Sequence, residues 1–142
     1  MLLTQKDKIM KHRFSLKDRL ESVLYTLKHK IAFLKVEKKL RGRNTWRGYL
    51  HDVEKPFLYL VPWFSDQDVQ NFHRAHNRHH VENNLKKSKE DLLDAVIDWE
   101  CARMTKPDKL LNAYDTLMKF YPEHKDEYLP IIRKYLPEQI HD

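Results

Sequence analysis

The chain has 142 residues, of which 34% are charged and 41% hydrophobic, with two glycines, six prolines and one cysteine. This length suffices to bury a core without disulfides or a structural metal. The single cysteine excludes an intramolecular disulfide framework, and the composition fits a helical protein better than a disordered or an all-β one. We therefore predict one compact all-α domain over residues 1–142, a bundle of about five to six helices, whose net charge of +6 is compatible with a polyanionic partner.

The amino-terminal segment, residues 1–13, precedes the first predicted helix, and we expect it to be flexible. It contains no apolar stretch followed by a small-residue cleavage site, so no secretory signal is predicted. The single Cys101 fits a reducing compartment. Together these features predict a cytoplasmic protein.

The first predicted helix runs from Ser15 to Leu40, with Ser15 as N-cap and Asp18 at the third helical position. Its apolar residues form two stripes on nearly opposite sides, so we expect the helix to be buried on both. One stripe consists of Leu16, Leu20, Val23, Leu27, Ile31 and Leu34, and the other of Tyr25, Phe33, Val36 and Leu40. His29 falls in the second stripe and should point inward, either as a hydrogen-bonded core histidine or as a ligand.

A basic run lies on the same helix and just beyond it, formed by Lys28, Lys30, Lys35, Lys38, Lys39, Arg41 and Arg43. Such a run could attract nucleic acid or another polyanion. A solvated helix face is the commoner origin of such a pattern, so both interpretations stay open.

A second helix is predicted over residues 45–56, because the residue before a proline disfavours α geometry. It carries the adjacent pair His51 and Asp52, with Lys55 one turn later. An irregular aromatic connection follows. The longest uncharged stretch, Pro56–Phe64, has nine residues where a membrane span needs about 20, so no membrane helix is predicted.

A third helix is predicted over residues 65–84, with Ser65 as N-cap. Its inward arc changes along the chain from apolar to histidine and consists of Val69, Phe72, His73, His76, His79, His80 and Asn83. A solvent-facing histidine run would not be expected to continue the phase of the apolar residues. His76 and His80 stand at i and i+4, the spacing with which two helical histidines bind one metal ion.

A fourth helix is predicted to begin after Ser88, with Asp91 at its third position. Its apolar side consists of Leu92, Leu93, Val96 and Ile97, and Asp98 lies beside it. A carboxylate there is costly unless it binds a metal ion or pairs with a cation such as Arg103. Two further helices are predicted over residues 108–121 and 123–136, as packing elements without chemistry.

In chain order, His29, the pair His51-Asp52, the histidines at 76 and 80, and Asp98 form the pattern H…HD…H…H…D. This pattern resembles that of the HD-domain superfamily of metal-dependent phosphohydrolases. The segments LKHK, W..YLHDVEKP, F.RAHNRHHVEN and AVIDW are more closely similar to a small family of bacterial and phage HD-like proteins without assigned function. The resemblance covers about residues 27–103.

The resemblance implies an all-α bundle with one or two divalent ions at its centre. Its primary ligands would be His29, His51, Asp52 and Asp98. A second ion would be completed by His76 and His80, with His79 as an alternative to His80. Val53 and Glu54 stand where relatives often carry a glycine-containing turn, which leaves open a protein that binds metal without turnover.

Imidazole and carboxylate ligands without a cysteine cluster suit Mn, Fe, Co, Ni, Zn or Mg. A bound dication lowers the pKa of a coordinated water and polarises a phosphoryl oxygen, so a phosphate ester is the expected substrate. In this interpretation Asp52 bridges the ions, Lys55 neutralises a substrate phosphate, and His73 lines the entrance with Arg74. A nucleotide is favoured if the aromatic residues wall a pocket for a base, although packing is their commoner role.

The sequence thus predicts a metal-dependent phosphohydrolase that acts on a phosphorylated small molecule. Two other functions stay open. The first is a non-catalytic metal-binding helical protein, which is expected to have a closed coordination site. The second is a nucleic-acid-binding or partner-binding module that uses the basic first helix, with oligonucleotide binding that weakens steeply with salt.

Overall fold

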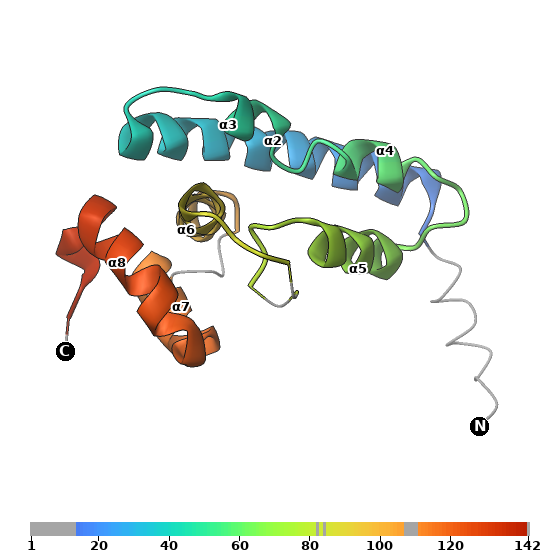
Figure 1. Ribbon diagram of the computed structural model, residues 1–142. Helices are drawn as coiled ribbons and strands as arrows, with labels where there is room; N and C mark the ends of the chain where they lie inside the picture. The colour runs from blue at the N-terminus through green and yellow to red at the C-terminus, as the bar shows by residue number, and fades with distance from the viewer. Residues whose placement is uncertain (1–13, 82, 84, 107–110, 142) are drawn as a thin grey trace.

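The computed structural model describes residues 14–81, 83, 85–106 and 111–141 (Figure 1). Its α-helices are α2 (Leu16–Arg41), α3 (Trp46–Leu50), α4 (Lys55–Tyr59), α5 (Asp66–His76), α6 (Lys89–Thr105), α7 (Ala113–Phe120) and α8 (Lys125–Tyr135). Short 3₁₀ helices follow α7 and α8, at Pro122–His124 and Pro137–Gln139. No strand occurs in these ranges, so the fold is all-α, as predicted. The flexibility expected for residues 1–13 and the helix start expected at residue 108 lie outside the described residues.

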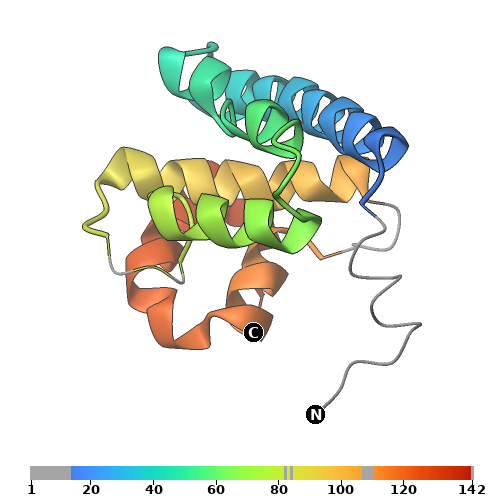
Figure 2. The ribbon, with the colours of Figure 1, turned by 90° about the vertical axis from the view of Figure 1, so that its right-hand side faces the viewer.

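The helices pack in layers around α6 (Figures 1 and 2). The long helix α2 lies on one side of α6, with α3 and α4 packed along α2, while α7 and α8 pack on the other side. Helix α5 packs against α4 and faces the same interior space as α6. None of the described helices is long and apolar enough to cross a membrane.

Three helix starts agree with the sequence prediction because each is fixed by local chemistry. A capping box begins α2 at Ser15 and Asp18, α5 at Ser65 and Asp68, and α6 at Ser88 and Asp91. In each box the serine hydroxyl accepts a hydrogen bond from the aspartate amide, and the aspartate carboxylate accepts one from the serine amide. Helix α2 also ends as predicted, at Gly42, whose φ of 84° is the left-handed geometry that glycine tolerates.

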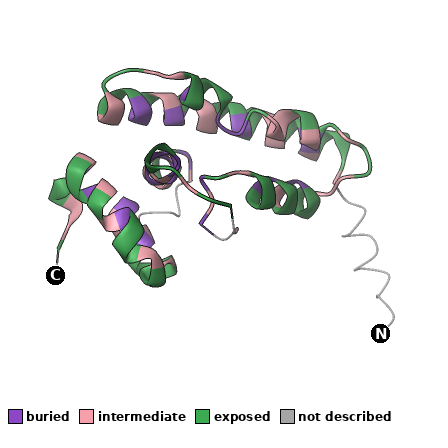
Figure 3. Cartoon of the chain, in the orientation of Figure 1, coloured by how far each residue is buried: buried purple, intermediate pink, exposed green. Residues whose placement is uncertain are grey.

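Helix α6 is buried on two sides, and each side has its own core. Toward α2 the core consists of Ala32, Phe33, Val36, Leu93, Ile97 and Cys101. Toward α7 and α8 it consists of Val81, Ala95, Val96, Ala113, Leu117, Tyr128, Ile132 and Leu136. The buried residues in Figure 3 therefore concentrate where the layers meet.

The expectation that α2 is buried on both sides is wrong. Its second stripe enters the core through Phe33 and Val36, but the first stripe faces outward (Figure 3). Leu16 is 69% exposed and Ile31 57% exposed. The physical reason is that α2 lies in an outer layer, where α6, α3 and α4 cover the rest of its circumference.

The single helix predicted over residues 45–56 is also wrong, as is the irregular structure predicted for all of residues 57–64. The chain instead forms α3 and α4, joined by a turn at residues 51–54. Pro56 is the second residue of α4 and fits in its first turn. Proline is tolerated there because the backbone N–H that it lacks would have no partner within the helix.

The helix predicted over residues 65–84 ends early, at His76. Asn77 is extended, with φ −111° and ψ 126°. Its side-chain amide donates a hydrogen bond to the His73 carbonyl (2.8 Å) and another to Glu54 (2.8 Å), and so replaces the next helical turn. His79 and His80 consequently lie in the segment after α5. The later helix expected from residue 108 is seen from Ala113, with Asn112 as its N-cap.

An ionic cluster ties α3 to α2 and α6, and its members are buried or half-buried except for Arg47, which is exposed. We call it the arginine network: Glu37, Arg41, Arg47, Asp91 and Asp94. Glu37 accepts hydrogen bonds from the Thr45 amide (3.0 Å) and the Thr45 hydroxyl (2.7 Å) and pairs with Arg41. Gly48 packs so closely that a Cβ atom there would lie 2.1 Å from Glu37 Oε1. The network therefore fixes the segment that leads directly into His51 and Asp52.

Candidate metal centre

The pair His51-Asp52 occupies the two central positions of a tight turn. His51 has φ −58° and ψ 126°, Asp52 has φ 55°, and the Val53 amide donates to the Leu50 carbonyl at 3.2 Å. These are features of a type II turn, whose third residue needs a positive φ that aspartate tolerates better than most residues. The turn directs both side chains inward, so that His51 and Asp52 are only 6% and 4% exposed.

A first ligand group forms where this turn meets α2 and α6: His29, His51, Asp52 and Asp98, with one donor atom of each lying within 4.8 Å of the others. Asp98 Oδ1 accepts hydrogen bonds from His29 Nε2 (2.7 Å) and His51 Nε2 (3.1 Å). The His51 ring stacks on Phe33 of α2, with ring centres 3.8 Å apart. Helix packing and the turn thus bring together four residues that are up to 69 positions apart in the chain.

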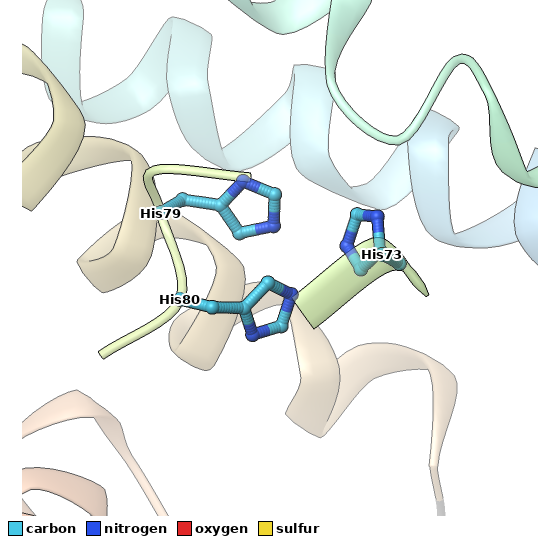
Figure 4. Close-up of side chains that lie close together, drawn as sticks. All are labelled: His73, His79 and His80. Carbon is cyan, nitrogen blue, oxygen red and sulfur yellow. The ribbon is translucent and has the colours of Figure 1, made fainter. Parts of the chain in front are cut away.

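A second ligand group consists of His73, His79 and His80 (Figure 4). His73 comes from the last turn of α5, while His79 and His80 come from the segment that follows it, and the three rings turn toward one another. The centre of the His80 ring lies 4.6 Å from that of His73 and 4.4 Å from that of His79. The early end of α5 allows this arrangement, because in a continued helix His80 would lie about 10 Å from His73 along the helix axis.

Asp52 joins the two groups. Its Oδ1 lies 2.9 Å from His73 Nε2, 3.3 Å from His79 Nε2 and 3.4 Å from His51 Nε2, while its Oδ2 lies 3.9 Å from His29 Nε2. Donors held about 2.1 Å from one ion are about 3.0–3.4 Å apart in octahedral or tetrahedral geometry. The three distances from Asp52 Oδ1 therefore match the edges of a coordination polyhedron, whereas the distance from Oδ2 to His29 is longer.

Several of these atoms are buried without a hydrogen bond. Among the described residues, Asp52 Oδ1, His73 Nε2 and His79 Nε2 have none, although each nitrogen lies within 3.3 Å of that oxygen. Burying polar atoms without partners is costly, so such atoms call for an ion or another ligand. The residues present fit a divalent cation on this ground.

Glu54 orients the His73 ring. His73 Nδ1 donates to the Glu54 carboxylate, which also accepts from the Asn77 side chain at 2.8 Å. Carboxylates commonly fix metal-binding histidines in this way, because a proton held on Nδ1 leaves the Nε2 lone pair for the metal. Here that lone pair would face Asp52 Oδ1, another electron-rich atom, and either a proton on Nε2 or a cation between the two atoms would relieve the repulsion.

The electrostatics keep both aspartates ionised. Burial by itself would raise the pKa of the Asp52 carboxyl, but the imidazoles around it and the Lys55 ammonium hold that pKa well below its usual range. Burial likewise opposes ionisation of Asp98, yet His29 and His51 hold its pKa well below the ordinary value. Both carboxylates are thus available as ligands at neutral pH.

The titration of His73 and Cys101 follows from the same surroundings. Burial would lower the pKa of His73, but the carboxylates of Asp52 and Glu54 outweigh it and raise that pKa. Burial, with Asp98 nearby, raises the pKa of the Cys101 thiol well above its ordinary value. Cys101 therefore stays a thiol, which donates to the Asp98 carbonyl at 3.3 Å.

The two groups open onto one cavity of about 600 Å³. Its polar and charged lining includes His29, Asp52, Lys55, Gln70, His73, Arg74, His80, Asp98, Lys106, Thr116 and Lys119, and its apolar lining includes Tyr25, Trp99, Ala102, Leu111, Phe120 and Tyr121. Lys55 Nζ lies 3.7 Å from Asp52 Oδ2 at the wall of this cavity. A small molecule can therefore reach the ligand groups from a space that also presents cations and aromatic rings.

The structure brings the predicted site residues together with one exception, His76. His29, His51, Asp52 and Asp98 meet, Lys55 and His73 lie beside them, and His79 and His80 are both present with His73. His76 is exposed, and its Nδ1 lies 2.8 Å from the Phe72 carbonyl. Asp98 does not pair with Arg103, which contacts Glu100 at 2.7 Å.

Sequence reasoning missed the role of Glu54 and did not foresee two intramolecular contacts of the basic run. Glu54 was visible only as a departure from the HD pattern, and nothing in the sequence pairs it with His73. In the basic run, Lys30 donates to the Tyr49 carbonyl and Arg41 belongs to the arginine network. The nucleic-acid interpretation of that run stays a prediction.

Comparison of the chain with protein-family models, with curated proteins and with solved structures finds no match.

Proposed function

We propose that the chain is a metal-dependent phosphohydrolase of the HD-domain type, acting on a phosphorylated small molecule, with a nucleotide as the favoured substrate. The observation that supports it is that two groups of metal-binding side chains share Asp52 at the wall of one cavity. The HD resemblance of the sequence supports the reaction, and the imidazole and carboxylate donors suit ions from Mg to Zn.

Each residue has a role in this proposal. Asp52 and Asp98 stay ionised and, with the histidines, hold one or two divalent ions. Such an ion lowers the pKa of a bound water and polarises a phosphoryl oxygen. Lys55 neutralises charge on the phosphate, and Glu54 keeps the His73 ring turned toward the ligand group. The sequence predicts His73 at the entrance of the site, whereas in this proposal His73 is a ligand of the metal ion.

The test compares untagged wild-type protein with Asp52→Asn, because asparagine keeps the size of the side chain and tolerates the positive φ. Elemental analysis should find one or two equivalents of transition metal in the wild type and a large loss in the variant. Hydrolysis of p-nitrophenyl phosphate and of nucleoside monophosphates should fall with the metal, while the helical circular dichroism signal stays unchanged. His124→Ala, at a histidine that contacts Glu127 outside the cavity, is the matched control.

Two outcomes decide against the proposal. Asp52→Asn with full metal content and full hydrolysis would remove Asp52 from the site. Wild-type protein that binds metal but hydrolyses no phosphate ester would instead support a non-catalytic metal-binding protein.

A further inference from the structure

The cavity presents more positive charge than one phosphate at the ligand groups requires. Lys55, Arg74, Lys106 and Lys119 line it. Lys55 is paired with Asp52. The ion pairs within the described ranges include no carboxylate partner for Arg74, Lys106 or Lys119. Among the described residues, these three cations therefore face the cavity without an ion-pair partner.

Lys106 is displaced along α6 from the ligand groups, and the Tyr25 ring beneath its ammonium lies 6.5 Å from the His29 ring, centre to centre. Lys106 is the C-cap of α6, eight residues beyond Asp98, which corresponds to about 12 Å along the helix axis. Its ammonium lies over the Tyr25 ring, 5.8 Å from the ring centre, and Lys119 lies 5.3 Å from the centre of the Phe120 ring. Cations held over aromatic faces are pre-positioned in the cavity wall.

Aromatic rings also line this cavity. Trp99 follows Asp98 directly, and its ring stacks on Tyr121 with centres 5.5 Å apart and planes 14° apart. Both rings line the cavity. A flat substrate group could lie against them in a cavity that also holds the ligand groups and the lysines.

We propose that Lys106 and Lys119 form a second anion-binding site, so that the substrate is a phosphate ester with a further anionic group, such as a nucleoside bisphosphate. The phosphate to be hydrolysed faces the ligand groups, and the other anion faces the two lysines. The identity of the substrate rests on the proposed function, whereas the anion site itself is present without metal.

The first experiment measures binding by isothermal titration of the chelator-treated protein at low salt, with adenosine 3′,5′-bisphosphate and adenosine 5′-monophosphate as probes. The wild type should bind the bisphosphate about tenfold more tightly or better, as expected for added charge-assisted hydrogen bonds. The double variant Lys106→Ala/Lys119→Ala should lose this preference. Lys106→Arg, which keeps the charge, should retain it, and so should Lys125→Ala, at an exposed lysine of α8 outside the cavity.

Equal binding of the two probes by the wild type, no binding of either, or a preference that survives in the double variant would overturn the second anion site. Hydrolysis of the monophosphate by Mn-loaded wild type reports separately on the proposed function. A retained bisphosphate preference in a protein that hydrolyses no ester would reject the phosphohydrolase and keep the anion site. The reverse result would reject only the anion site.

Discussion

Two clusters of buried charge lie along the same pair of helices, and they use their polar atoms differently. Helix α2 contributes His29 to the ligand groups and Glu37 to the arginine network, eight residues further on. Helix α6 contributes Asp98 to the ligand groups and Asp94 to the network, one turn earlier. Phe33, which stacks on His51, lies between the two on α2.

In the arginine network, every carboxylate oxygen of Glu37 and Asp94 accepts a hydrogen bond, although the buried Arg41 Nε has no partner among the described residues. Glu37 accepts hydrogen bonds from Thr45 and Arg41. Asp94 accepts hydrogen bonds from Arg41 (2.6 Å) and Arg47 (3.0 Å). Among the ligand groups, Asp52 Oδ1 and two imidazole nitrogens are buried with no hydrogen bond in the part of the chain that the structure describes. Opposite charges that satisfy each other hold helices together, whereas converging lone pairs leave a place for a cation.

The largest effect should come from breaking the network. Glu37→Ala leaves Arg41 and the Thr45 amide without their buried acceptor, and removal of one partner of a buried ion pair costs about 3–5 kcal/mol of unfolding free energy. Urea denaturation of the metal-free protein measures this loss. The metal affinity of the molecules that remain folded should be unchanged.

Glu90→Ala is the matched control, because Glu90 pairs with the same Arg41 at 3.1 Å but its side chain is 56% exposed. An exposed pair of this kind contributes about 0–1 kcal/mol. Equal destabilisation by the two substitutions would show that burial does not set the role of the network.

A second pair of substitutions tests whether metal binding depends on the ligand groups or only on the number of histidines in the chain. His73→Ala removes a buried ring 2.9 Å from Asp52 and should abolish binding at the second group, lowering the metal stoichiometry or affinity. His76→Ala removes an exposed ring three residues away and should leave metal binding unchanged. Elemental analysis and metal titration of both variants measure the contrast. Loss of metal in His76→Ala alone would return this residue to the site, as the sequence pattern predicts.

Local chemistry explains what the sequence could predict. The three capping boxes involve only neighbouring residues, so Ser15, Ser65 and Ser88 mark helix starts correctly. The order of the candidate ligands His29, Asp52 and Asp98 was predicted from helical phase and the HD resemblance, and the structure brings these residues together.

Contacts between distant residues explain what the sequence could not predict. The end of α5 depends on Asn77 reaching Glu54, 23 residues earlier, and the histidines at 73, 76 and 80 fit a continued helix equally well by phase. Burial of α2 depends on which of two apolar stripes meets α6, and both have helical spacing. Periodicity identifies stripes but cannot say which one the rest of the chain covers.

A smaller effect should come from the support behind a ligand. Glu54→Ala frees the His73 ring and should weaken metal binding about 10–100-fold, the usual range for the outer partner of a metal-binding histidine. Glu54→Gln keeps an acceptor for His73 Nδ1 and should lose less. Competition with a metal indicator measures the affinities. Unchanged affinity in Glu54→Ala would mean that the Glu54 contact does not serve the metal.

The smallest effect should come from Asp91, which pairs with the partly exposed Arg47 at the edge of the arginine network, and it should depend on pH. Burial opposes ionisation of Asp91, but its hydrogen bonds with Ser88 and the charge of Arg47 outweigh this and lower its pKa. Because the pKa of Asp91 is lower in the folded protein than in the unfolded chain, its carboxylate stabilises the fold fully above the unfolded pKa of about 4. This stabilisation is lost as the pH falls through the pKa of the folded protein. Asp91→Asn should therefore cost about 0.5–1 kcal/mol at pH 7.

This difference between wild type and Asp91→Asn should disappear in acid, and it should shrink in high salt because Arg47 is partly exposed. Denaturant midpoints at pH 7 and pH 3, each at low and high salt, measure both trends. Metal affinity should not change in the variant, because Asp91 contacts Arg47 and Ser88 and belongs to neither ligand group. If the difference in stability persisted undiminished at pH 3, the Asp91 side chain would stabilise the protein through its shape and not through its charge. The carboxylate of Asp91 would then not contribute to the electrostatic difference between the two clusters.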